Sequence, residues 1–256
     1  MSAHLFARAE AVGDTMLSYA LVLFVGFIAG TVSGIVGTGA TVILLPVLVM
    51  VFGPREAVPI MAVVALMSNF AKITAWWRYI DWRAAAAYAL GGVPAAALGA
   101  RTLLALPENT VETALGVFFL AMIPGRRWLA RRNIALGYGG MFAAGIVIGF
   151  LTGIVVSTGP LSVPAFAAHG LVKGAFIATE AAGSLALYIS KAITFQAFGA
   201  LPTDIMAKGL ITGSSVMAGT YLARLIVERL SVAAFQYMLD IVMAVSGIAL
   251  LWQALR

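Results

Sequence analysis

The stretch SGIVGTGATVILLP at residues 33–46 decides the fold, because a near copy of it, TGIVVSTGPLSVP, occurs at residues 152–164. The two stretches align with a one-residue gap. Each begins within the last residues of a glycine-rich apolar segment, which spans 17–36 in the first copy and 139–156 in the second. An apolar piece of about a dozen residues follows each time, whereas an upright helix needs about 20 residues to cross a bilayer. We interpret both pieces, 42–52 and 161–168, as half-helices.

The two halves of the chain match in their later segments as well. Lys72 lies in the apolar run 57–79, and Lys191 lies at the corresponding place in the run 171–198. An internal duplication with interrupted segments at matching places is typical of secondary transporters. The remaining runs pair in the same way, 82–104 with 204–226 and 110–123 with 231–252. We therefore predict a short N-terminal tail at 1–16, a first transmembrane repeat at 17–124, a basic loop at 125–138 and a second repeat at 139–253.

Composition indicates an integral membrane protein. Of the 256 residues, 62% are hydrophobic and only 10% are charged, whereas soluble domains carry about 25% charged residues. We therefore predict an all-α fold, a polytopic transmembrane helix bundle in the cell (inner) membrane, with the lipid bilayer as its surroundings. The first 15 residues mix basic and acidic side chains, so we interpret them as an exposed tail and not as a cleaved signal.

Charge and residue usage exclude several other classes. The net charge of +6 does not point to nucleic acid, because four of the sixteen basic residues form one loop cluster. That loop, 125–138, is predicted to be cytoplasmic by the positive-inside rule. The chain has no cysteine and only two histidines, which leaves no thiolate or histidine metal site. We expect neither a metal nor a cofactor; a homo-oligomer remains open.

The orientation of the two repeats depends on the short pieces. If they count as crossings, each half crosses five times and the repeat is inverted; if they are re-entrant, each half crosses four times and the repeat is parallel. Both models place most Lys and Arg residues on the side of the basic loop, so the charge rule does not separate them. We favour inversion, because alternating access is commonly built on inverted repeats.

The intramembrane lysines are the first candidate site residues. A charged side chain at the centre of a membrane helix costs about 2.5–3.5 kcal/mol, so such residues mark function by default. At 100° per residue, Asn69 falls near Lys72, and Tyr188 falls at the edge of the helix side that holds Lys191 and Glu180. The alternative is that Lys72 and Lys191 form structural ion pairs with Glu180 and Asp240. Otherwise we expect the two carboxylates to couple transport to protons or another ion.

The glycine breaks are the second candidate. A helix start leaves backbone N–H groups unpaired and carries about half a positive charge, which suits an oxyanion. The alternative is that these small residues only permit close helix packing, which is what we expect of Gly26, Gly30, Gly149 and Gly153. The predicted binding residues at the two breaks are Thr38, Gly39 and Thr41 in the first copy and Ser157, Thr158 and Gly159 in the second.

The glycine-rich first segment, its break and the short run to a proline, GTVSGIVGTGATVILLPVL at 30–48, resemble the TauE/SafE (TSUP) family of sulfite and organosulfur anion exporters. The likeness recurs in the second half and covers nearly the whole chain, about 17–252. The family's usual GxGGG turn reads GTGAT at 37–41 here, and STGP at 157–160 in the second copy. The resemblance implies export of a small sulfur-containing oxyanion, such as sulfite or a sulfonate, driven by an ion gradient.

Three other classes of function remain as alternatives. A passive anion channel would line its pore with the same lysines and helix starts. An intramembrane enzyme needs a nucleophile beside a base, and here only Ser214 and Ser215 with His169 offer that chemistry, without a GxSxG or HExxH motif. An assembly role gives no reason for paired lysines in lipid. We therefore predict a non-enzymatic transporter of a small anion.

Overall fold

The computed structural model describes residues 2–37, 39–105, 135–154, 165–166, 168–171 and 173–226, with single positions at 110, 113, 117, 120, 121, 124, 162, 244, 248 and 252. In this part of the chain there are seven α-helices, one short 3-10 helix and no strand, so the all-α prediction is confirmed. The elements are α1 (Ser2–Val36), α2 (Ala40–Phe52), α3 (Pro54–Trp76), η1 (Trp77–Tyr79), α4 (Trp82–Leu104), α6 (Tyr138–Ile154), α8 (Lys173–Ala197) and α9 (Thr203–Ile226).

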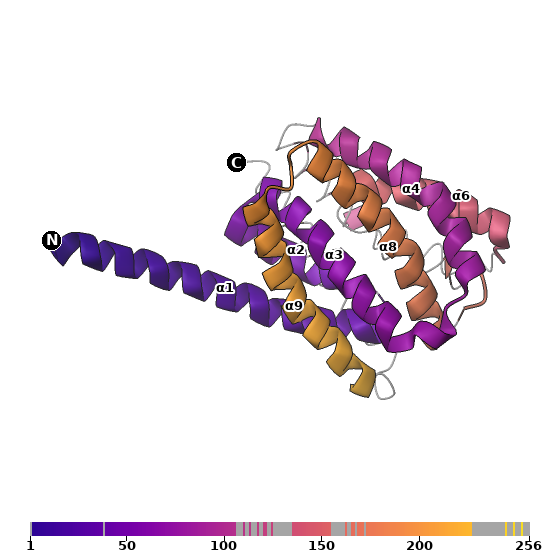
Figure 1. Ribbon diagram of the computed structural model, residues 1–256, viewed down its shortest axis with the longest axis horizontal. Coiled ribbons are helices and arrows are strands. Elements are labelled where there is room, and N and C mark those ends of the chain that lie inside the picture. Colours follow the sequence, from indigo (N-terminus) through magenta and orange to yellow (C-terminus); the bar gives the residue numbers. More distant parts are fainter. Residues whose placement is uncertain are drawn as a thin grey trace.

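The first helix is longer than predicted, because α1 begins at Ser2 and takes in the backbone of the expected tail. Residues 2–16 include four alanines and no proline, so a helix can continue through them. Figure 1 shows this first part of α1 projecting away from the bundle. The expected tail is thus helical backbone continuous with α1, which the sequence analysis did not predict.

Glycine and proline set the breaks around α2. Gly37 and Gly39 have φ angles of 88° and 115°, a left-handed backbone that glycine adopts without a steric penalty, and they separate α1 from α2. At the other end, Gly53 (φ 79°) precedes Pro54, the first residue of α3. The predicted half-helix 42–52 is thus present but begins at Ala40, which puts Thr41 inside its first turn.

α2 carries the chain back to the side where α1 enters the bundle. The ring of Phe52, at the end of α2, lies 5.6 Å from the ring of Tyr19 in α1. Lys208, near the start of α9, stacks over Phe52 and donates to the Glu56 carboxylate at 2.6 Å. Because Glu56 lies in the first turn of α3, helices α1, α3 and α9 all run from this side, which we call the Glu56 end.

The other three long helices run from the opposite side. Gly174, at the start of α8, lies against Trp76 at the end of α3 and Tyr79 in η1. His169 bonds the carbonyl of Leu136, just before α6, and lies 3.6 Å from the carboxylate of Asp81, the N-cap of α4. Helices α4, α6 and α8 therefore begin together, at what we call the Asp81 end.

The helices pack in a pattern that repeats. The five most extensive contacts are α4 with α6, α1 with α9, α3 with α9, α3 with α8, and α4 with α8, which Figure 1 shows as a bundle centred on α3 and α8. Exchanging α1 with α6, α3 with α8 and α4 with α9 gives the same five contacts. The two helices of each exchanged pair start at opposite ends of the bundle.

Glycines line two of these contacts, α1 with α9 and α6 with α4, at matching places. In α1, Gly26, Gly30 and Gly34 face α9, and in α6, Gly145, Gly149 and Gly153 face α4. A Cβ added at Gly30 would overlap the backbone of Val216, and one added at Gly149 would overlap the backbone of Gly92. The prediction that glycines of the spans serve close helix packing is therefore confirmed for these two helix contacts.

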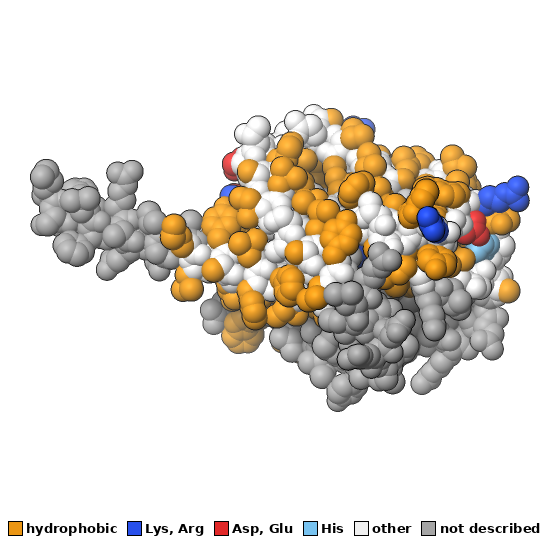
Figure 2. Space-filling view, turned by 60° about the horizontal axis from the view of Figure 1, so that its bottom comes forward, with side chains coloured by type: hydrophobic (Ala, Val, Ile, Leu, Met, Phe, Trp, Pro, Cys, Tyr) orange, Lys and Arg blue, Asp and Glu red, His pale blue; other side chains and the backbone are white. Residues whose placement is uncertain are grey.

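The exterior of the bundle is apolar and its interior holds the polar side chains. Leu90, Val147 and Ile193 are 71%, 60% and 63% exposed, whereas Lys191 and Thr212 have no exposed surface. Figure 2 shows hydrophobic side chains spread over the visible face. Two stretches of the described chain, Met16–Ile35 and Pro54–Tyr79, are long and apolar enough to cross a membrane by length and composition.

Candidate functional site

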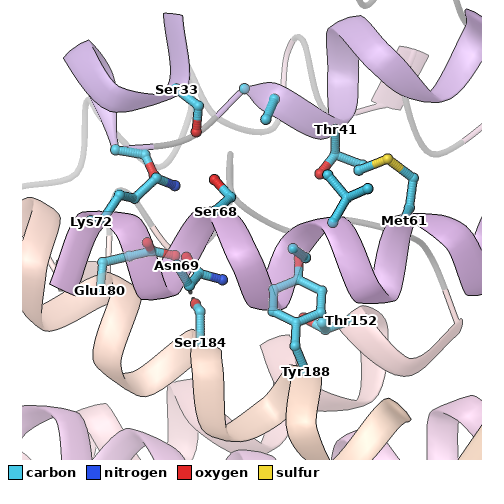
Figure 3. Close-up of a pocket in the computed structure, with 15 residues that line it drawn as sticks. Ser33, Thr41, Met61, Ser68, Asn69, Lys72, Thr152, Glu180, Ser184 and Tyr188 are labelled. Atoms are coloured by element: carbon cyan, nitrogen blue, oxygen red, sulfur yellow. Dashed lines mark hydrogen bonds between the residues drawn. The ribbon is translucent and has the colours of Figure 1, made fainter. Parts of the chain in front are cut away.

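A cavity of about 40 Å³ lies near the middle of α3 and α8, where the end of α1 and the start of α2 approach them (Figure 3). One enclosed water needs roughly 10–15 Å³, so the space fits a small polyatomic ion. A polar cavity at mid-depth between interrupted and continuous helices is where secondary transporters bind substrate. Among the described residues, its polar lining consists of Ser33, Thr41, Ser68, Asn69, Lys72, Thr152, Glu180, Ser184 and Tyr188.

Lys72 is the cation of this cavity. Its side chain is only 4% exposed, and its ammonium donates to the carbonyl of Gly37 at 2.7 Å. Gly37 directly follows α1, and the last carbonyls of a helix lack intrahelical partners, so the lysine satisfies a group that the break creates. An ammonium has three donors. The contact with Gly37 therefore holds Lys72 in place and leaves donors for a ligand.

Two buried hydroxyls beside Lys72 have no partner. The Oγ atoms of Ser33 in α1 and Ser68 in α3 make no hydrogen bond, although the residues are 1% and 3% exposed. Figure 3 shows both hydroxyls pointing into the space next to the Lys72 side chain. Leaving a buried polar group unpaired costs about 1–3 kcal/mol. Hydroxyl donors beside a buried ammonium are the chemistry that an oxyanion can accept from.

The start of α2 forms another wall of the cavity. Gly39, Ala40 and Thr41 all line it, and Gly39 is the N-cap of α2 without any side-chain cap. The first N–H groups of a helix have no intrahelical acceptor, so these are available to a bound anion. The structure thus places predicted residues Gly39 and Thr41 at the cavity; Thr38 lies outside the described residues.

Glu180 brings a carboxylate into the same cavity. It is 4% exposed, and its Oε1 accepts hydrogen bonds from Ser162 and Ser184 at 2.9 and 2.8 Å. Within the described part of the chain, no carboxylate lies at ion-pair distance from Lys72. The alternative of a structural Lys72–Glu180 pair is therefore absent from this conformation, and both charges remain beside the cavity.

The second lysine is placed differently from the first. Lys191 has no exposed surface, is not among the cavity-lining residues, and donates to the carbonyl of Thr152 in the last turn of α6 at 2.7 Å. Its ammonium also lies 5.3 Å from the ring centroid of Phe195. Lys191 therefore resembles Lys72 in bonding a carbonyl at the end of a helix, but it is not among the residues that line the cavity.

The remaining predicted residues divide into two groups. Asn69 and Tyr188 line the cavity from α3 and α8, as the helical periodicity predicts. The others belong to the second glycine break or are the last predicted carboxylate, and they lie outside the described residues: Ser157, Thr158, Gly159 and Asp240. Their roles stay predictions.

Sequence reasoning missed Ser33 and Thr152 as site residues, although a signal for them existed. Both residues line the cavity, and they open the two aligned copies SGIV and TGIV. A polar residue at the same place in both copies of an apolar motif marks a position where the helix end meets the polar interior. Ser162, which positions Glu180, sits in the second copy and carried no signal of its own.

The residues considered for an enzyme do not meet. Ser214 and Ser215 donate to the carbonyls of Ile211 and Thr212 in their own helix. His169 is held by the Leu136 carbonyl and Asp81 at the end of the bundle. No nucleophile–base contact joins these residues.

Comparison with known proteins identifies one family. The model of the family "Sulfite exporter TauE/SafE" matches residues 22–250, which is nearly the whole chain. No curated protein and no solved structure matches the chain.

Proposed function

Because the chain belongs to the sulfite exporter TauE/SafE family, we propose that it is a secondary transporter which exports a small sulfur-containing oxyanion, sulfite, a sulfonate or a related organosulfur anion, by alternating access. Membership in this family makes it a membrane transport protein. The observation that carries the substrate class is the small cavity in which Lys72, two unpartnered serines and an uncapped helix start converge.

The chemistry of the cavity supports an oxyanion over a cation or an apolar ligand. Lys72 supplies charge, Ser33 and Ser68 supply hydroxyl donors, and the first turn of α2 supplies N–H groups. Charge-assisted hydrogen bonds are about twice as strong as neutral ones, and they strengthen where water is excluded. A sulfur oxyanion presents several acceptor oxygens around one centre and can use these donors together.

We also propose that the two halves are inverted repeats. Support comes from the five main helix contacts, which are unchanged when equivalent helices are exchanged, and from the opposite direction of each exchanged pair. The return of α2 to the Glu56 end supports the five-crossing alternative over the four-crossing one. In an inverted repeat, a central site opens to one side or the other when one half rocks against the other.

Glu180 is our proposed coupling residue, because it is a buried carboxylate next to the proposed anion site. Asp240 is proposed for the same role from the sequence alone. We further propose the cell (inner) membrane as the location, with loop 125–138 on the cytoplasmic side, on the strength of its arginine cluster.

The test is flux in proteoliposomes containing the purified full-length protein. We expect sulfite to move faster than phosphate or a simple carboxylate, and an imposed ion gradient to accumulate sulfite against its own gradient. Downhill flux without accumulation would make the protein a channel. The absence of flux for sulfite, sulfoacetate and thiosulfate alike would overturn the proposed substrate class.

A further inference from the structure

The cavity combines two features that conflict for a fully ionised ligand. On one side stand donors, namely Lys72, Ser33 and Ser68, and on the other stands the Glu180 carboxylate, which can only accept hydrogen bonds when ionised. In a space of about 40 Å³, a bound oxyanion and this carboxylate are neighbours. Two adjacent anionic oxygens are tolerated when one proton lies between them. Glu180 therefore does not fit a simple anion site, whereas it fits a site for an anion that carries a proton.

The hydrogen bonds of Glu180 involve only one of its two carboxylate oxygens. Ser162 and Ser184 both donate to Oε1, and among the described residues no donor reaches Oε2. The carboxylate is thereby held in one orientation, with one acceptor oxygen unused. Figure 3 shows the carboxylate on the α8 side of the cavity, across from the Ser33 hydroxyl.

Among the described residues, no neighbouring group donates a proton to Glu180 Oε2 through a direct hydrogen bond. The charged and titratable groups of the described residues that face Glu180 are Lys72 on α3, Tyr88 on α4 and Tyr188 on its own helix. Lys72 is held by the Gly37 carbonyl, with no ion pair to Glu180. The unused acceptor is therefore open to a donor that arrives with the substrate.

We propose that Glu180 makes the cavity selective for a sulfur oxyanion that carries its own proton, such as hydrogen sulfite, over fully ionised anions such as sulfate and alkyl sulfonates. This inference rests on the proposed function, since it assigns the substrate class of the same site. The hydroxyl of the bound ion donates to Glu180 Oε2, while its other oxygens accept from Lys72, Ser33 and Ser68. One proton then crosses the membrane with each anion.

The experiment measures binding to the purified full-length protein by ligand-induced thermal stabilisation. Sulfite, sulfate and methanesulfonate are compared below and above the pH at which hydrogen sulfite loses its proton. We expect wild type to bind sulfite and neither of the other two ions. Its affinity for total sulfite should fall about tenfold per pH unit above that point, because only the protonated fraction binds.

The variant Glu180→Gln separates selectivity from folding. It removes the charge and keeps the shape, so we expect sulfate and methanesulfonate to bind at least about tenfold more tightly than to wild type, the gain expected when about 1.4 kcal/mol of repulsion is removed. The control Glu56→Gln changes a carboxylate at the Glu56 end and should preserve the wild-type preference. If Glu180→Gln does not fold, the comparison of sulfite, sulfate and methanesulfonate binding to wild type still tests the inference.

Three outcomes overturn the inference alone. The first is equal binding of sulfate and sulfite by wild type, the second is a Glu180→Gln variant that folds and retains the wild-type preference, and the third is binding of methanesulfonate but not of sulfite by wild type. If neither sulfite nor methanesulfonate binds wild type at any pH, the proposed function fails, and this inference falls with it.

Discussion

The two intramembrane lysines occupy equivalent places in the sequence but not in the structure. Lys72 bonds the carbonyl after α1 and faces the cavity, beside two orphan hydroxyls and the start of α2. Lys191 bonds a carbonyl in the last turn of α6, has no exposed surface, and lies against Phe195. A duplicated residue can thus keep its structural contact, a bond to a carbonyl at a helix end, in both copies, while only one copy lines the cavity.

The difference between the two lysines also suggests what should happen in the opposite state. Lys72 and Lys191 lie past the middle of α3 and α8, which begin at opposite ends of the bundle. If the halves exchange conformations during transport, Lys191 becomes the lysine that lines the cavity and Lys72 the one that does not. The substitutions below therefore refer to the state of this structure.

The largest effect is expected at the α2 start. Gly39→Val should abolish anion binding, because a β-branched side chain at φ 115° costs about 1–3 kcal/mol of strain and blocks approach to the first N–H groups. Gly53→Val is the matched control, since Gly53 also has positive φ but has no neighbour within 4 Å of an added Cβ and does not line the cavity. Binding of sulfite to both variants is measured by thermal stabilisation. Equal affinities in the two folded variants would remove the helix start from the site.

The second largest effect on anion binding is expected for Lys72→Met. Loss of a hydrogen bond to a charged group costs about 1.5–3 kcal/mol, so we expect anion affinity to fall about 10–150-fold and transport to stop, with membrane insertion unchanged. Lys208→Met removes a lysine of the Glu56 end and should leave affinity at the wild-type value. Wild-type flux in Lys72→Met would make this lysine structural or incidental.

Lys191→Met should act on stability more than on binding. The Thr152 carbonyl would lose a buried donor, which costs about 1–3 kcal/mol of folding free energy. We expect a lower melting temperature, with sulfite affinity within about threefold of wild type, less than the tenfold step that 1.4 kcal/mol produces. An affinity loss as large as that of Lys72→Met would show that both lysines serve one site.

The smallest effects should come from the unpartnered hydroxyls, of which the described residues hold three. Ser33→Ala and Ser68→Ala should each weaken sulfite binding about fivefold, from the roughly 1 kcal/mol of one hydrogen bond. Thr212→Val removes the third, which lies outside the cavity, and should raise the melting temperature without changing affinity. If Thr212→Val lost as much affinity as the serine variants, the position of the two serines at the cavity would not explain their effect on binding.

The sequence predicts most helices well, because their ends are marked by local chemistry. The bounds of α4 agree with the predicted run, and glycine and proline mark the breaks on both sides of α2. The 100° periodicity also selects Asn69, Glu180 and Tyr188, which all line the cavity. It cannot tell that Lys191 misses the cavity, because that depends on how α6 packs against α4 and α8. For the same reason the periodicity cannot identify Ser33, whose place at the cavity depends on how the end of α1 packs within the bundle.

The most direct test of the central claim, that the Lys72 cavity is the anion site, is anomalous diffraction from crystals of the protein soaked in selenite, an isostere of sulfite. We expect one selenium peak inside the cavity, with oxygens about 3 Å from the Lys72 Nζ and the Ser33 and Ser68 Oγ atoms. A peak elsewhere, for example beside Lys191, with no peak in the Lys72 cavity, would contradict the account.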